Sequence, residues 1–205
     1  MDHEQILQKV ETIYEANGEP ALSNADLELA NLSFMNLNQI DLSQANLNQA
    51  NLRHTNLRQA DLSQANMNNA NLIQADLSQG NLNGAELIKA TMNGANLNEA
   101  QLIGSNLNNA DMSQVNLSRA NLSGANLSQT NLSQANLLRA NLCWANLCQA
   151  DLSQADLGGA NLSWADLSQA DLSQVILRDV IYNHQTKWPQ GFYAQTHGAF
   201  LFQVE

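Results

Sequence analysis

The chain has 205 residues, of which 44% are hydrophobic but only 5% are aromatic and 13% are charged. Its formal net charge of −11 disfavours nonspecific binding to nucleic acid or to an anionic membrane, because both need clustered Lys and Arg. No stretch approaches the roughly 20 apolar residues of a membrane span, and the acidic N-terminus lacks the regions of a secretory signal. A cytoplasmic location is therefore expected.

The first 24 residues are predicted to form an N-terminal cap built on a helix over residues 2–19. Asp2 and Gln5 have the spacing of a capping box, Gly18 suits the end of a helix, and Pro20 prevents its continuation. One stripe of the helix would be apolar and suited to lie across the adjoining core: Ile6, Leu7, Val10, Ile13 and Tyr14.

From Ala25 to Gln174 one five-residue pattern, Ala-Asn/Asp-Leu-polar-polar, runs without insertion or deletion. These 150 residues make 30 pentapeptides, whose positions we number one to five. The third position is Leu in 27 repeats and Met in the other three, the first is Ala in 23, and the second is Asn or Asp in 27. Such regularity predicts a repeat architecture, not an ordinary globular core.

A period of five fits neither of the ordinary elements. On a helix, five residues advance the direction by about 140°, so the leucines would spiral around the axis. On a flat strand, an odd spacing sends successive leucines to opposite faces. A chain that turns one corner per pentapeptide keeps every Leu and Ala inside. A spacing of 20 in Gly84, Gly104, Gly124, Trp144 and Trp164 hints at four sides per coil.

The motif resembles that of the pentapeptide-repeat family. The resemblance implies an all-β solenoid, a right-handed quadrilateral parallel β-helix with four repeats per coil and with the first and third positions inward. We assign residues 25–179 to this solenoid, with Val175–Asp179 as a degenerate last repeat. Asn and Asp at the second position are expected to accept local backbone hydrogen bonds and to form the corners.

Residues 180–205 are predicted to form a C-terminal cap, because the repeat gives way to an aromatic segment. The segment contains Tyr182, Trp188-Pro189, Phe192, Tyr193, Phe200 and Phe202. It resembles the Trp-Pro-containing tails that follow the last coil in relatives from photosynthetic bacteria. An open solenoid end invites association, so a homodimer through this cap is one interpretation.

No residue pattern indicates catalysis, a metal site or a cofactor, and we expect the protein not to be an enzyme. Cys143 and Cys148 are too few for a zinc site of their own and are interpreted as free thiols. His54 stands alone at an outward position and is expected to be solvated, while His184 and His197 lack further ligands at metal-binding spacing. The Asp residues recur at the second position for a backbone reason.

Trp144, Trp164 and Leu138 are the candidate partner-contact residues. The two tryptophans lie outward and one coil apart, following three glycines, and Leu138 and Cys143 add apolar surface nearby. The alternative is that the two rings pack on each other and only shield a local defect.

Two functions are open. The first is a non-catalytic interaction or scaffold module with an unidentified protein partner. The second is the activity of some family members, which mimic B-DNA and modulate DNA gyrase. Charge favours the first: a DNA mimic of this length needs roughly 20 charges. The fourth and fifth positions carry only two acids, Glu28 and Glu99, against five bases, Arg53, Arg58, Lys89, Arg119 and Arg139.

Overall fold

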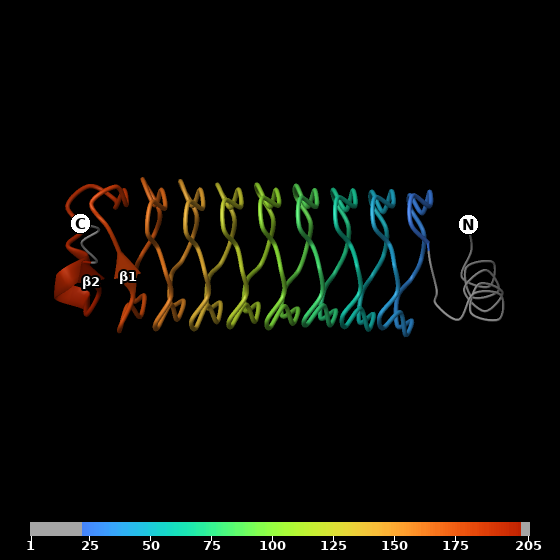
Figure 1. The fold of residues 1–205 in the computed structure, drawn as a ribbon, viewed down its shortest axis with the longest axis horizontal. Coiled ribbons are helices and arrows are strands. Elements are labelled where there is room, and N and C mark those ends of the chain that lie inside the picture. The colour runs from blue at the N-terminus through green and yellow to red at the C-terminus, as the bar shows by residue number, and fades with distance from the viewer. Residues whose placement is uncertain (1–21, 202–205) are drawn as a thin grey trace.

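The computed structural model describes residues 22–201, which form one elongated coil (Figure 1). A parallel bridge joins each second-position residue to the second-position residue 20 places later, from Asp26–Asn46 to Asn161–Ile181. Four successive pentapeptides therefore complete one coil, and the 20-residue period expected from the glycines and tryptophans is confirmed. The helix predicted over residues 2–19 lies outside the described residues.

Each side of a coil makes three backbone hydrogen bonds with the coil that follows. On the side that begins at Ala25, the Leu27 N–H donates to the Asn46 carbonyl (2.7 Å) and the Leu29 N–H to the Asn48 carbonyl (3.0 Å). The Asn46 N–H donates back to the Ala25 carbonyl (2.9 Å). Because each pairing is this short, only the second-position residue forms a parallel bridge to the next coil, and long strands do not form.

The corners lie at the fourth and fifth positions. The expectation that Asn and Asp at the second position form the corners is wrong, because those residues make the parallel bridges. At a typical corner the Ala45 N–H donates to the Leu42 carbonyl (3.1 Å), and Gln44 has φ +59°. A positive φ at the third residue alone is the mark of a type II turn. The second-position side chain supports the turn from outside, as the Asp41 Oδ1 accepts the Ser43 N–H (2.9 Å).

The core consists of the first- and third-position side chains, as predicted. Third-position Leu and Met residues in the repeats are buried along the whole rod, together with the alanines of the first position. The few polar residues at the first position are satisfied locally. Thr55 and Thr130, for example, donate to the carbonyls of Leu32 and Leu107, each at 2.8 Å. Each side of the coil thus contributes one column of buried leucines to the core, and the removal of these side chains from water stabilises the fold.

Second-position amides form directional ladders along the outside of the rod. The Asn116 Nδ2 donates to the Asn96 Oδ1 (3.0 Å), and the Asn96 Nδ2 donates in turn to the Asp76 Oδ1 (3.0 Å). The donor always belongs to the later coil. An Asp can therefore receive a bond from the next coil but cannot donate to the previous one, so each Asp interrupts its ladder.

The C-terminal segment, residues 181–201, lies against the last coil (Figure 1). Strand β1 (Ile181–Tyr182) pairs in parallel with β2 (Phe200–Leu201), and the 3-10 helix η1 (Ala194–His197) lies between them. Aromatic rings fill the segment: Trp188 meets Tyr182 edge-on at 5.4 Å and stacks on Phe192 at 5.4 Å. Among residues 22–201, no helix is long and apolar enough to cross a membrane.

Candidate partner-contact site

Both candidate tryptophans lie at one corner of the coil, stacked one above the other. We call this the Gly–Trp corner and define it by its fifth-position residues, Gly84, Gly104, Gly124, Trp144 and Trp164. The rings of Trp144 and Trp164 are 5.0 Å apart and inclined by 7°. Coils spaced by about 4.8 Å place equivalent side chains at this separation, so the register of the fold itself imposes the stacking.

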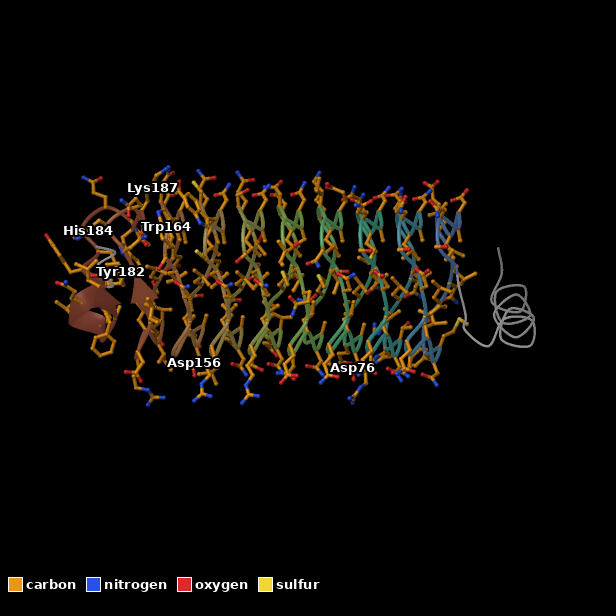
Figure 2. All side chains as sticks on the ribbon, viewed as in Figure 1. Asp76, Asp156, Trp164, Tyr182, His184 and Lys187 are labelled. Atoms are coloured by element: carbon orange, nitrogen blue, oxygen red, sulfur yellow. The ribbon has the colours of Figure 1, made fainter. Side chains whose placement is uncertain are left out.

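The two rings are not equally accessible. Trp144 is 63% exposed, whereas Trp164 is half-buried and lies next to the C-terminal segment, near Lys187 in the view of Figure 2. The backbone of Trp164 is held there by the Asn183 side chain, whose Oδ1 accepts the Trp164 N–H (3.0 Å). Trp144 therefore presents the accessible end of the stack.

Beyond Trp144 the corner is open, and one residue there adds exposed apolar surface. A Cβ atom added at Gly104 or Gly124 would meet nothing within 4 Å, and the neighbouring Ile103 is 44% exposed. Cys143 is half-buried beside Trp144 in the sequence, and burial raises the pKa of its thiol. The thiol therefore stays neutral near pH 7, and adds no charge to this surface.

The Gly–Trp corner also differs from the other three corners in charge. Its fourth- and fifth-position residues between Ser23 and Trp164 include no Asp, Glu, Lys or Arg. The other corners carry the charged residues found at these positions: Glu28, Arg53, Arg58, Lys89, Glu99, Arg119 and Arg139. A partner that binds the Gly–Trp corner would bury little charge, and so would avoid a large desolvation penalty.

Leu138 lies at the neighbouring corner and packs in another direction. Its Cδ2 is 2.9 Å from where a Cβ of Gly158 would stand, so the Leu138 side chain covers that glycine in the next coil. No ring contact or hydrogen bond joins Leu138 to the tryptophan pair among residues 22–201. Its role in partner contact stays a prediction.

A second aromatic stack was missed by sequence reasoning. Phe34 stacks on His54 with ring centroids 4.9 Å apart and planes inclined by 15°. His54 is therefore half-buried beneath a ring that is itself 73% exposed, and not an isolated solvated side chain. The signal was present in the sequence, because the two residues are 20 apart and both occupy the fifth position.

The carboxylates and histidines are engaged in local contacts. Second-position Asp side chains accept the N–H of the residue two places later, as Asp151 does from Ser153 (2.9 Å). His197 stacks on Phe192 at 4.7 Å in the C-terminal segment. Within residues 22–201, no group of three His, Cys, Asp or Glu side chains is placed to hold a metal ion.

A coil with four pentapeptides per turn, an inward Leu at each third position and bridges every 20 residues defines a pentapeptide-repeat solenoid. The family model for pentapeptide repeats matches residues 25–64, 65–100, 95–134 and 135–174. The chain belongs to the pentapeptide-repeat family. No curated protein sequence matches it.

Three solved structures of pentapeptide-repeat proteins resemble this chain. HetL from Nostoc sp. strain PCC 7120, a protein involved in heterocyst differentiation regulation, is 32% identical over 88% of this chain and 94% of its own, with a TM-score of 0.44. Rfr23 from Cyanothece 51142 is 39% identical over 45% of this chain, with a TM-score of 0.45. This chain spans 63% of the length of Rfr23.

The third structure is QnrB1, a plasmid-mediated fluoroquinolone resistance protein. It is 20% identical over 81% of this chain and 91% of its own, with a TM-score of 0.56. At this identity the similarity concerns the fold, and function must be argued from the site.

Proposed function

We propose that the chain is a non-catalytic interaction module, in which a right-handed quadrilateral β-helix over residues 25–179 presents the Gly–Trp corner to a protein partner. Residues 1–24 and 180–205 would act as its caps. The observation that carries the proposal is the exposed ring of Trp144, stacked on Trp164 in the one corner whose turn residues carry no charge. Exposed Trp is costly to leave in water and is enriched among the residues that dominate protein interfaces.

The second-position carboxylates make structural hydrogen bonds, which supports a non-catalytic role. The second-position carboxylates accept backbone N–H groups at their own corners, as Asp41 and Asp151 do. Hydrogen bonds from Ser173 lower the pKa of Asp171, so this carboxyl holds its charge and is a poor proton donor at neutral pH. These contacts support a structural role for the acids.

The test is a comparison of captured partners between the wild type and a double variant, Trp144→Gln with Trp164→Gln. Gln is the conservative choice because Gln44 and Gln64 occupy the same corner with φ of +59° and +57°. In affinity capture from native extract, quantified by mass spectrometry, the amount of at least one captured protein should be about tenfold lower with the double variant than with the wild type. Phe34→Gln, which removes the other aromatic stack, is the matched control and should keep that protein.

Both variants must first show the melting temperature of a folded coil. A partner list that is the same for the double variant and the wild type would assign the tryptophans to packing alone.

Mimicry of DNA is not the function that the charges support. The second-position carboxylates number ten, nine Asp and Glu86, and they are distributed over all four sides. Asp76 and Asp156, labelled in Figure 2, lie on the same side of the coil. Asn residues separate the two acids, and an isoleucine follows Asp156. A mimic needs rows of charge at phosphate-like density. The similarity to QnrB1 concerns the fold alone and does not support DNA mimicry by this chain.

A further inference from the structure

The last coil leaves the side from Ala170 to Gln174 without a following coil. On each side from residues 25–29 to residues 155–159, two N–H groups and one carbonyl pair with the next coil. Here, among residues 22–201, the N–H groups of Leu172 and Gln174 and the carbonyl of Ala170 have no such partner. This is an open parallel β-edge, and such an edge pairs readily with an extended peptide.

The acid on this edge also lacks a contact that four other second-position acids have. Asp26, Asp61, Asp76 and Asp111 each accept an Asn Nδ2 from the following coil, at 2.9–3.1 Å. Asp171 is bridged to Asp151 below it and, within the described range 22–201, to no residue above it. Hydrogen bonds from Ser173 keep the pKa of Asp171 below its ordinary value, so it is charged at neutral pH. Two stacked carboxylates thus face an empty position.

The space over the edge is hollow, and its floor belongs to the repeat core. A cavity of about 330 Å³ is lined by Ala170–Ser173 on one side and by Pro189–Phe192 on the other. Ala170 and Leu172 are 8% and 9% exposed, more than the alanines and leucines in the middle of the rod, which are almost completely buried. Among residues 22–201, the segment opposite makes no backbone hydrogen bond to the edge: Pro189 has no N–H, and its carbonyl accepts the Phe192 N–H in a local turn (3.1 Å).

The neighbouring side shows which residues complete such an edge. Lys187 takes the second position over Asp166: its N–H donates to the Ala165 carbonyl (2.9 Å) and its own carbonyl accepts the Leu167 N–H (2.7 Å). Its Nζ donates to the Asp166 Oδ2 (2.9 Å). The flanking residues are a buried small residue, Thr186, and a large apolar one, Trp188, which packs on the core.

We propose that the Ala170–Gln174 edge is a β-augmentation site for an extended segment of a protein partner that carries a small residue, then Lys or Arg, then a large apolar residue. The cation would lie over Asp171 and Asp151, the apolar side chain over Leu172, and the peptide backbone would complete the three missing hydrogen bonds. This site is separate from the Gly–Trp corner and goes beyond the function proposed for it.

The test uses the full chain, labelled with ¹⁵N, and three synthetic peptides. The probe is acetyl-Ala-Lys-Leu-Ser-amide, and the matched peptides replace Lys by Glu or carry a methyl group on the Lys backbone nitrogen. We expect the probe to shift the amide resonances of Leu172 and Gln174 and to slow their hydrogen exchange. The Glu peptide loses the ionic contact and the methylated peptide loses the bond to the Ala170 carbonyl, so each should bind about tenfold more weakly.

Two variants separate charge from shape. Asp171→Asn keeps the acceptor for the Ser173 N–H but removes its charge, and should lower the ratio of Lys-peptide to Glu-peptide affinity several-fold, with the Asp151 charge accounting for the rest. Asp76→Asn, at mid-rod, is the matched control and should leave the ratio unchanged. The Trp144→Gln, Trp164→Gln double variant should bind the probe as the wild type does, which distinguishes this site from the Gly–Trp corner.

Several outcomes would overturn the proposal. Equal affinity for the three peptides, or shifts confined to residues away from 170–174, would exclude pairing at this edge. Protection of the Leu172 and Gln174 amides without peptide would mean that the edge is already occupied. If that protection grows with protein concentration, the occupant is a second copy of the chain and not a partner peptide.

Discussion

In the repeating coils, contacts between neighbours come from backbone groups and from one type of amide ladder, whereas the C-terminal segment replaces several of them with individual side chains. The Asn183 Oδ1 takes the place of a backbone carbonyl for the Trp164 N–H, and Lys187 takes the place of an Asn over Asp166. A one-residue insertion accompanies the change, since Asp166 pairs with Lys187, 21 places later.

The difference shows that ending a solenoid does not require a new kind of interaction. It requires residues that satisfy the last coil and offer no further edge. The C-terminal segment does this on the sides of Asn161 and Asp166. Among residues 22–201, the side of Asp171 is left without a partner, and on the side of Ile176 only the Asp179 N–H finds one, the Gly198 carbonyl (3.1 Å).

Removal of the C-terminal segment should have the largest effect. Deletion from Tyr182 onward exposes the last leucines and the unpaired backbone groups of every side of the coil, so we expect soluble aggregates or end-to-end association and a lower melting temperature. Size-exclusion chromatography with light scattering and a thermal melt measure both. A truncated chain that stays monomeric and melts like the wild type would mean that the segment does not cap the coil.

Within the coils, a core truncation should cost more than the truncation of an outward amide at the neighbouring position. Leu107→Ala removes a fully buried side chain and should lower the free energy of unfolding by about 2–5 kcal/mol. Asn108→Ala should cost about 1 kcal/mol, because the Asn108 Nδ2 donates to the Ser128 carbonyl (2.9 Å). Urea denaturation measures the two values, and equal losses would contradict the inward and outward assignment.

The direction of the amide ladder can be tested by Asn96→Asp. The variant keeps the acceptor for Asn116 but removes the donor to Asp76 and sets two carboxylates against each other. We expect a loss of about 1–3 kcal/mol near neutral pH. Repulsion raises the folded-state pKa of the pair, so the loss should shrink as the pH falls through that raised value.

The control for the ladder is Asn161→Asp. The Asn161 Nδ2 has no partner among residues 22–201, and the residue above it is Ile181. The substitution should therefore change the unfolding free energy little in chemical denaturation. A loss as large as that of Asn96→Asp would show that the donor to the previous coil is not what matters.

The ion pair that joins the C-terminal segment to the coil should give a smaller, pH-dependent effect. Desolvation raises the pKa of the Asp166 carboxyl. Hydrogen bonds from Ser168 and Lys187, together with the Lys187 charge, lower the pKa by more than desolvation raises it, so the net shift is downward. The hydrogen bond and charge of Asp166 raise the pKa of Lys187.

The signs of these shifts define the pH window. Asp166 contributes stability above its ordinary value of 3.8, and this is lost as the pH falls through the lowered pKa. The Lys187 contribution is complete below its ordinary value of 10.5 and is lost as the pH rises through the raised pKa. Melting temperatures of the wild type and Lys187→Met should therefore differ at pH 7 and converge near pH 2. A difference that persists at pH 2 would assign the effect to packing of the Lys stem.

No effect is expected on DNA gyrase. The coils distribute their acids over four sides, with at most two carboxylates in adjacent coils, so micromolar protein should neither inhibit supercoiling nor protect the enzyme from quinolones. A supercoiling assay at low salt is the strictest test, because screening is weakest there. Inhibition that disappears when Asp151, Asp156, Asp166 and Asp171 are neutralised would show that these carboxylates suffice for mimicry.

The period of five was enough to predict a chain that turns at every repeat and its inward positions, and the spacing of the glycines and tryptophans added the 20-residue register. It was not enough to place the corners, because Asn and Asp are common both in turns and beside them. The candidate tryptophans were found because they depart from the repeat at a spacing of 20. Phe34 and His54 have the same spacing, but they are residues of different types, so the repeat pattern did not identify them as a pair.

The sequence by itself determined which side chains form the core of this protein, because one Leu and one small residue in every five can face inward only if the chain turns at every repeat. Only the tertiary structure decided which residues bend, that the amide ladders donate toward the N-terminal end, and which side of the last coil stays unpaired. These features depend on hydrogen bonds between groups 19–21 residues apart. Because equivalent positions of the repeats have similar residues, the sequence alone does not show which of these groups are paired.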